Sequence, residues 1–296
     1  MLQASDVDEE VARLIDLIRS GVGDDRGLVF VSGGLDSDVV ARLTVRALGV
    51  SRVKLLTVVQ DDMSPIHLEQ ARSLAAQLGV ELIEIDMRGL HLEVLYRLAA
   101  ADQQEEFDPL GLLDPARMKC SLRTVLTSTY QDRGYVVIGT GNRTESELGF
   151  FLPFGDGIWH IGPIAHLYKT EVRLIAAAVG TSESVLGQPP SAGFWIDQTD
   201  REDIGFWLVN EGPIQREREF SDDEVTQAGE FSRKLDETAL DELLLILSEG
   251  GVTGEAPLPP DLIAKVELVV KRSARFKGRP TGVTLSRLSS DSASTI

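Results

Sequence analysis

The stretch Val31-Ser32-Gly33-Gly34-Leu35-Asp36-Ser37 lies between a short apolar run and a segment with helical periodicity, and it decides the fold and chemistry of this chain. Two adjacent glycines allow a tight bend in which the backbone approaches a ligand closely. Free N–H groups and the positive end of the following helix then face an anion. A carboxylate at Asp36 would repel a bare phosphate, but a Mg²⁺ ion bound to both removes the conflict. The loop therefore predicts a phosphate and cation site, although a plain strand–turn–helix connection with Asp36 as N-cap also fits.

The segments around this loop alternate between short apolar runs and helical patterns. Neither the Walker phosphate loop nor a Rossmann Gly-x-Gly-x-x-Gly follows the first apolar run. Strands separated by helices of this length form βαβ units, so we expect an α/β fold with a parallel sheet and helices on both faces. The expected strands are 28–31, 54–59, 81–86 and 135–139, and the expected helices are 6–20, 39–48, 65–78 and 114–131, the last with Asp114 as N-cap after an acidic loop at 101–114.

Changes of pattern divide the chain into four parts. Residues 1–205 contain the alternating segments and are expected to form one domain. Residues 206–240 form an insertion, expected to be helical because Ser221-Asp222-Asp223-Glu224 is a capping box. Residues 241–280 begin with the apolar run DELLLILSEGG and are expected to complete the domain with helices. Residues 281–296 are rich in serine and are expected to be a flexible tail.

The composition narrows the class of protein. The 296 residues include 29 basic and 47 acidic ones, a net charge of −18 that disfavours nucleic-acid binding. A basic cluster between Lys265 and Arg279 fits either a solvated helix face or an arm that contacts phosphate. The single cysteine, Cys120, forms no internal disulfide, and no stretch is apolar enough for a membrane span. We therefore expect a cytoplasmic protein without a membrane segment.

Longer blocks add a resemblance to a known family. The loop SGGLDS resembles the pyrophosphate loop of the N-type ATP pyrophosphatases, known as the PP-loop superfamily. The blocks GTGNRTESELGFFLPFGDG (139–157), PIAHLYKTEVRLIA (163–176) and PPSAGFWIDQTDREDIG (189–205) resemble the NAD synthase family in order and spacing. With the loop, the resemblance extends over most of the first 205 residues. It implies the adenine nucleotide α-hydrolase-like arrangement of a Rossmann-like sheet.

The resemblance also implies an activity. Members of the family adenylate the carboxylate of nicotinic acid adenine dinucleotide with ATP and release pyrophosphate, and ammonia then displaces AMP to give NAD. Glutamine-dependent members have a catalytic cysteine ahead of the loop, whereas here Cys120 follows it. The chain is therefore expected to be of the ammonia-dependent type, using free ammonia or ammonia from a separate glutaminase. Relatives of this type are homodimers, which we expect here as well.

The resemblance assigns roles to individual residues. It places magnesium at Asp36 and Glu145, and the dinucleotide acid near Asp156. Asp36, Asp156 and Lys169 are the expected catalytic residues, although no protein nucleophile is needed. The positions expected to bind ATP are Ser32, Gly33, Gly34, Leu35, Asp36, Ser37, Thr140, Lys169 and Ser191.

Local alternatives exist for each assignment. Asp36 could cap the following helix, and Glu145 could be a solvated carboxylate in the first turn of a helix. Asp156 could be an ordinary turn residue between two glycines. Lys169 could be solvated, although a cation is unfavourable at the start of a helix, which hints at an anionic partner.

Two departures from the family pattern leave the acceptor open. His160 stands where members often have a second acidic residue, and Ser121 stands where they have an arginine. A relative that amidates another carboxylic acid is therefore one alternative. A sulfurtransferase with Cys120 as sulfur carrier is a second, and a non-catalytic nucleotide-binding module is a third.

Overall fold

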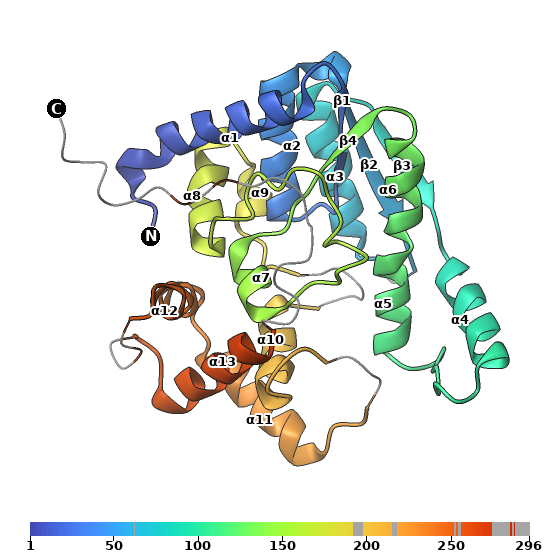
Figure 1. Ribbon diagram of the computed structural model, residues 1–296, viewed down its shortest axis with the longest axis vertical. Coiled ribbons are helices and arrows are strands. Elements are labelled where there is room, and N and C mark those ends of the chain that lie inside the picture. The colour runs from blue at the N-terminus through green and yellow to red at the C-terminus, as the bar shows by residue number, and fades with distance from the viewer. Residues whose placement is uncertain are drawn as a thin grey trace.

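Four strands form one parallel sheet in the order β3-β2-β1-β4 (Figure 1). The computed structural model describes residues 1–61, 63–191, 198–214, 218–251, 253, 256–273, 285 and 287. In β1, Leu28 pairs with Lys54 of β2 on one side and with Val137 of β4 on the other. The parallel sheet and its four strands are thus confirmed within two residues. The strands are β1 (Arg26–Phe30), β2 (Val53–Val59), β3 (Leu82–Asp86) and β4 (Tyr135–Ile138).

Helices cover both faces of the sheet, as the alternating pattern predicts (Figure 1). One face carries α1 (Val7–Val22), α2 (Leu35–Leu48), α3 (Pro65–Leu78), α8 (Lys169–Val179) and the short α9 (Glu183–Leu186). The opposite face carries α5 (Leu113–Ser121) and α6 (Arg123–Gln131), with α4 (Leu90–Ala101) beside them. Two short 3-10 turns, Ala4–Asp6 and Val50–Arg52, precede α1 and β2.

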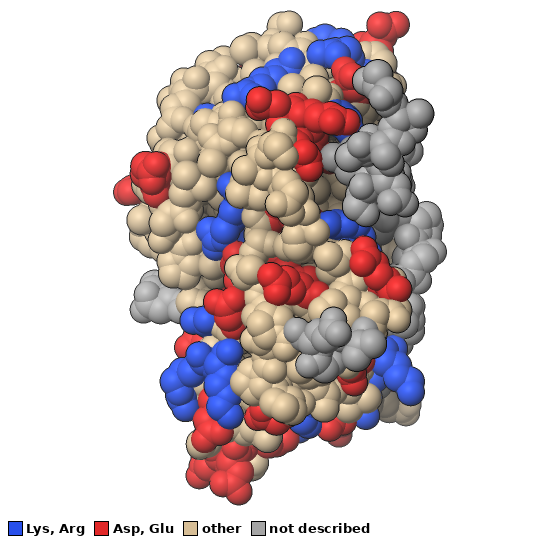
Figure 2. Space-filling view, turned by 90° about the vertical axis from the view of Figure 1, so that its left-hand side faces the viewer, with Lys and Arg blue, Asp and Glu red and all other residues tan. Residues whose placement is uncertain are grey.

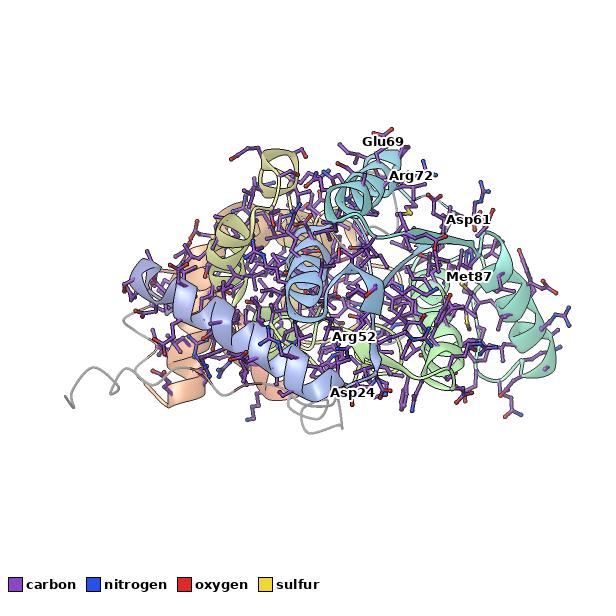
Figure 3. The ribbon with its side chains drawn as sticks, turned by 90° about the horizontal axis from the view of Figure 1, so that it is seen from above. Asp24, Arg52, Asp61, Glu69, Arg72 and Met87 are labelled. Carbon is purple, nitrogen blue, oxygen red and sulfur yellow. The ribbon has the colours of Figure 1, made fainter. Side chains whose placement is uncertain are left out.

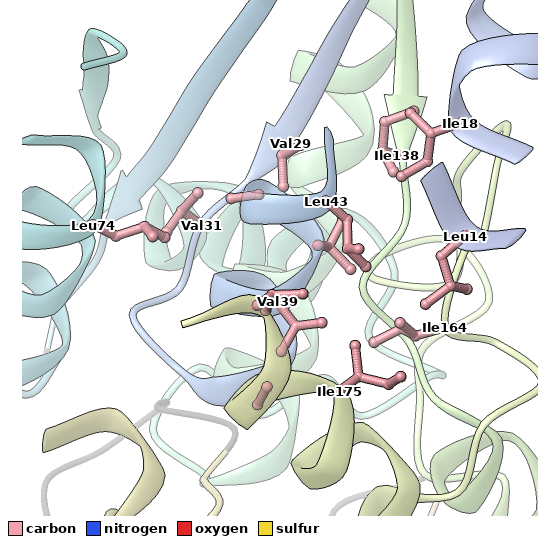
Figure 4. Close-up of a cluster of buried hydrophobic side chains, with 14 of the residues drawn as sticks. Leu14, Ile18, Val29, Val31, Val39, Leu43, Leu74, Ile138, Ile164 and Ile175 are labelled. Carbon is pink, nitrogen blue, oxygen red and sulfur yellow. The ribbon is translucent and has the colours of Figure 1, made fainter. Parts of the chain in front are cut away.

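The main core lies between the sheet and the helices of the first face (Figure 4). Successive side chains of a strand point to opposite faces. Val29 of β1 and Val31, just after the strand, therefore join this core, whereas Leu28 packs on the other face with Leu56 and Val137. Most of the labelled side chains of Figure 4 come from strands or helices, whereas Val31 and Ile164 lie in connecting segments; the labelled residues are Leu14, Ile18, Val29, Val31, Val39, Leu43, Leu74, Ile138, Ile164 and Ile175.

The C-terminal helices form a second apolar cluster below the sheet in Figure 1. They are α10 (Asp200–Val209), α11 (Asp222–Lys234), α12 (Glu237–Glu249) and α13 (Pro260–Ser273), together with the short α7 (Arg143–Leu148). The predicted capping box starts α11, where Ser221 and Glu224 bond each other's backbone N–H groups. Phe231, Leu243 and Val266 are among the residues that fill the cluster.

Three expectations about helices need correction. The helix expected at 114–131 is two helices, α5 and α6. Asp114 lies inside the first turn of α5 rather than at its N-cap, and its carboxylate accepts the N–H of Asp108 at 2.9 Å. Helix α4 was not expected. Its N-cap is Gly89, whose N–H donates to the Asp61 carboxylate at 2.6 Å. Asp61 and Met87, two residues before this N-cap, are labelled in Figure 3.

Candidate active site

A large cavity opens at the carboxyl edge of the sheet. The chain runs from β1 to β2 and β3 on one side and returns to β4 on the other, so the loops after β1 and β4 diverge and leave a crevice between them. The cavity measures about 470 Å³. Of the expected site residues, the structure brings these to its wall: Ser32, Gly34, Leu35, Asp36, Ser37, Thr140, Glu145, Asp156, Lys169 and Ser191.

Gly33 is the one expected position that does not line the cavity among the described residues. Its φ of +85° belongs to the left-handed region, which favours glycine. A Cβ at this position would lie 2.0 Å from the carbonyl oxygen of His67 on α3. Gly33 therefore lets the loop bend against α3, and its contribution is conformational.

Two serine hydroxyls fix the shape of the loop. Ser37 Oγ donates to the carbonyl of Gly34 at 3.0 Å and lies 3.1 Å from Ser32 Oγ. The N–H of Gly34 donates to Ser32 Oγ at 3.2 Å. Both serines were expected to donate to phosphate, which stays a prediction; in the structure their hydroxyls hold the bend itself.

Helix α2 begins at this loop with an open N-terminus. Its N-cap is Gly34, and no described side chain caps the helix. Asp36 lies in the first turn and does not cap it, so the plain capping alternative for Asp36 is wrong. The first N–H groups of α2 and the positive end of its dipole are consequently available to an anion in the cavity.

Asp36 is paired with a lysine from a distant part of the chain. Lys169, the first residue of α8, donates from Nζ to Asp36 Oδ2. The two side chains are only 9% and 17% exposed. A solvated Lys169 is therefore wrong, and its ammonium group lies beside the glycine loop.

The charges around this pair are not balanced. Burial and the nearby carboxylate of Asp36 raise the pKa of Glu145 well above its usual range. Burial alone would lower the pKa of Lys169, but Asp36 and Glu145 outweigh it and the net pKa is raised. Two carboxylates thus compete for one ammonium group, an arrangement that a further cation stabilises.

The donor set fits Mg²⁺ better than a metal held by protein alone. Asp36 Oδ1 is buried and lacks a hydrogen-bond partner in the described part of the chain. The described residues contain no group of three or more metal-ligating side chains. Mg²⁺ is commonly held by one or two carboxylates together with phosphate oxygens and water. Asp36 and Glu145 therefore fit the predicted magnesium site.

Local structure explains the place of Glu145. It forms a capping box with Asn142 at the start of α7: the Glu145 N–H donates to Asn142 Oδ1, and the Asn142 N–H donates to Glu145 Oε2, both at 3.0 Å. Because the Gly139–Gly141 segment follows β4 directly, α7 starts at the edge of the cavity. Glu145 is half-buried rather than fully solvated.

Asp156 lies in the turn between Gly155 and Gly157 and is held on both sides. Its Oδ1 accepts the Leu152 N–H at 2.9 Å and the Cys120 thiol at 3.1 Å. The thiol is buried, and burial together with the charge of Asp156 raises its pKa. Asp156 is therefore both a turn residue and part of the cavity wall, and Cys120 is a poor nucleophile.

Several residues of the wall were not assigned from sequence. Asp200 and Asp203 of α10 face the cavity, as does Arg173, one turn after Lys169 on α8. Burial raises the pKa of Asp203 to about 7, and Gln198 Nε2 donates to its carboxylate at 2.7 Å. The acidic block QTDRED, which contains both aspartates, could have indicated from the sequence that they belong to the site.

Residues of the 206–240 segment, which was expected to be an insertion, also reach the cavity. Phe206, Trp207, Ile214, Arg218 and Phe220 line it, although nothing in their spacing indicated this. The remaining part of the block after Ser191, residues 192–197, lies outside the described residues.

The two sequence departures differ in their placement. His160 does not line the described cavity; its Nδ1 accepts the Val137 N–H of β4 at 2.9 Å. Ser121 ends α5, next to the cavity residue Cys120. The His160 imidazole thus extends the hydrogen bonding at the β4 edge of the sheet, where the next residue, Ile161, forms a parallel bridge with Ile138.

The late basic cluster is partly neutralised. Lys265 Nζ and Arg272 Nη2 lie 2.8 and 3.1 Å from the carboxylate of Glu211, which favours a helix face with ion pairs. Its members after Ser273 lie outside the described residues. On the face in Figure 2, basic side chains lie in separate groups beside acidic ones.

Part of the expected tail is in contact with the domain. Arg287 forms an ion pair with the buried Glu171 at 2.6 Å and packs over the Tyr168 ring at 4.9 Å. Leu285 packs against the main core. The rest of 281–296 lies outside the described residues, so its flexibility stays a prediction.

A parallel sheet with a glycine loop at its switch point and an uncapped helix beyond it is the arrangement of an α/β nucleotide-binding protein. The family model described as NAD synthase matches residues 10–244. The chain belongs to the NAD synthase family.

Curated relatives are similar to the chain in sequence, and solved structures are similar to it in fold. The NH(3)-dependent NAD(+) synthetase of Methanococcoides burtonii is 37% identical over 209 residues, covering 69% of this chain and 75% of the relative. That of Pyrococcus horikoshii is 27% identical over 278 residues, covering 94% and 95%. Two solved structures share the fold. An NMN synthetase from Francisella tularensis has a TM-score of 0.68 and 21% identity, and the match covers 91% of this chain and 95% of that one. An NH3-dependent NAD synthetase from Campylobacter jejuni has a TM-score of 0.66 and 22% identity, and the match covers 93% of this chain and 97% of that one. Within the described ranges, no helix has the length and apolar character needed to cross a membrane.

Proposed function

We infer that this chain is an ATP-dependent ligase that forms a carbon–nitrogen bond with ammonia and converts nicotinic acid adenine dinucleotide into NAD. Family membership over residues 10–244 supports the reaction class. The observation that carries the assignment of the site is the buried contact between Lys169 and Asp36. It joins two blocks separated by more than a hundred residues at the mouth of a glycine loop.

The reaction has two steps. A carboxylate is a poor electrophile, so its oxygen first attacks the α-phosphorus of ATP, and the bond to pyrophosphate breaks. The resulting acyl-adenylate has a good leaving group. Ammonia then attacks the carbonyl carbon, AMP leaves with the bonding electrons, and the amine loses a proton to give the amide.

The chain contributes position and charge rather than a nucleophile. The open N–H groups of α2 bind the departing pyrophosphate, and the Lys169 ammonium group offsets its charge. Asp36 and Glu145 would hold Mg²⁺, which neutralises phosphate charge when bound. Asp156, on the cavity wall, would face the acceptor.

The structure of Cys120 disfavours sulfur transfer. A sulfur carrier must be ionised to attack, and the raised pKa of this buried thiol opposes ionisation. The thiol is also engaged in a hydrogen bond to Asp156. Amide formation is therefore preferred to the sulfurtransferase alternative.

A homodimer and a cytosolic location complete the proposal. Large apolar side chains near the α5–α6 face are exposed, and a second copy would cover them. They are Leu110, Leu112, Val125 and Phe154.

Steady-state assays with ATP, Mg²⁺ and ammonium test the function. We expect AMP, pyrophosphate and NAD in equal amounts from nicotinic acid adenine dinucleotide. Turnover of nicotinic acid mononucleotide instead would change the acceptor and keep the mechanism. Equal AMP formation by the wild type and D36A would overturn the assignment of the site.

A further inference from the structure

Asp241, on α12, is a buried carboxylate outside the cavity wall. We propose that it is a positioning residue that fixes Lys169 and Glu145 together, and this rests on the roles proposed for those two residues. It is 0% exposed and comes from the C-terminal helical part of the chain.

Its two oxygens bind two different helices. Oδ1 accepts the hydroxyl of Thr144 on α7 at 2.6 Å. Oδ2 accepts both the N–H and the hydroxyl of Thr170 on α8, each at 2.8 Å. Thr144 directly precedes Glu145, and Thr170 directly follows Lys169. The Asp241 carboxylate therefore holds the chain neighbour of Glu145 and the chain neighbour of Lys169 at the same time.

The contacts form a cap for α8 built from other helices. The N-cap of α8 is Tyr168, whose N–H donates to Glu171 of the same turn at 2.8 Å, and the next two N–H groups find their partners on other helices. The N–H of Lys169 donates to Thr144 Oγ1 at 2.9 Å, and that of Thr170 donates to Asp241. The first turn of α8 thus takes its position from α7 and α12, and the negative charge suits a helix N-terminus.

Asp241 reaches this place because α12 is firmly packed. Its neighbours Leu240, Leu243 and Leu244 belong to the second apolar cluster. A second link between the same helices lies nearby, where Arg173 Nε donates to Glu237 at 2.6 Å. The packing of the C-terminal helices therefore determines where the Lys169 ammonium group lies.

The described hydrogen-bond partners of Asp241 are all neutral, so none of them offsets the cost of burying its carboxylate with an opposite charge. Burial raises its pKa to about 6, while the two threonines oppose the rise. An ionised carboxylate with hydroxyl and amide partners stabilises the fold less than an apolar side chain of similar size would. Its contribution to the geometry of the site accounts for its presence.

Kinetics of D241N and T144V in the full chain test the proposal. Both keep the side-chain size, but D241N loses one acceptor and T144V loses the hydroxyl. We expect kcat to fall at least tenfold while the KM of the acid acceptor stays within twofold. T144S restores the hydroxyl and is expected to recover most of the activity. Hydrogen exchange should become faster in a peptide that spans Lys169 and Thr170.

D236A is the matched control. Asp236 caps the same helix, accepting the Ala239 N–H at 2.9 Å, but touches neither threonine. It should lower stability and leave kcat within twofold. Wild-type kcat in D241N and T144V would overturn the proposal, as would an equal loss in D236A. If D241N does not fold, the T144V and T144S pair decides. An inactive wild type would instead refute the proposed function.

Discussion

Replacement of Lys169 by methionine should destabilise the protein strongly, because it removes the ammonium group from a buried ion pair. Asp36 would then remain 17% exposed beside Glu145 without its directly bonded cation, although the charge of Arg173 would still act on it. Breaking a buried pair from one side costs about 3–5 kcal/mol. Since Asp36 keeps some contact with the cavity, we expect about 3 kcal/mol.

A double-mutant cycle isolates the pair. D36N alone leaves Lys169 with Glu145 as a partner, so its loss should be about 1 kcal/mol. The double variant K169M/D36N removes both charges and should be more stable than K169M. The expected coupling free energy is about 2 kcal/mol.

Urea unfolding of the four proteins measures these values by linear extrapolation. EDTA must be present, because a bound cation would replace the missing ammonium group. K234M is the matched control: Lys234 and Asp261 are 46% and 54% exposed, and loss of that surface pair should change stability by less than about 1 kcal/mol. A loss below about 1 kcal/mol in K169M, or no coupling with D36N, would refute the reasoning.

Three further predictions concern the walls of the site. Gly33→Ala should cost at least about 2 kcal/mol in thermal unfolding, because φ is +85° and the new Cβ meets the His67 carbonyl; an unchanged melting temperature would contradict this. The folded pKa of Asp203, raised by burial to about 7 from 3.8, means that the folded state holds this proton more tightly than the unfolded state. The free energy of unfolding should thus fall by about 2–4 kcal/mol as pH rises from about 4 to about 7, and D203N should remove that part of the pH profile. C120S should keep kcat within twofold; a tenfold loss would favour sulfur transfer.

The fold could be predicted in large part because its signals are local. Apolar runs such as Leu28–Val31 and the helical spacing of Val172, Ile175 and Val179 depend only on which faces are buried. The boundary between α5 and α6 was missed because it carries no local signal in the sequence. Leu122 keeps a right-handed helical backbone (φ −61°, ψ −20°), so no glycine or proline marks the interruption.

The site could be predicted only where a motif carries it. The glycine loop and the block around Glu145 indicated their own residues, but the partner of Asp36 was not deducible from spacing. Asp203 and Arg218 reach the cavity through α10 and the segment before α11, and no periodicity reports which face of an added helix meets an active site.

The sequence by itself determined the parallel sheet, the bent loop with Gly33 and the family, because each follows from short-range backbone preferences or from the order of motifs along the chain. Only the tertiary structure decided that Lys169 pairs with Asp36 and that Asp241 caps α8. Those contacts join segments about 70 to 130 residues apart. Their favourable free energy comes from ion pairing and hydrogen bonding at low dielectric, which offset the cost of burying the charges; the partners come together only after the helices have packed.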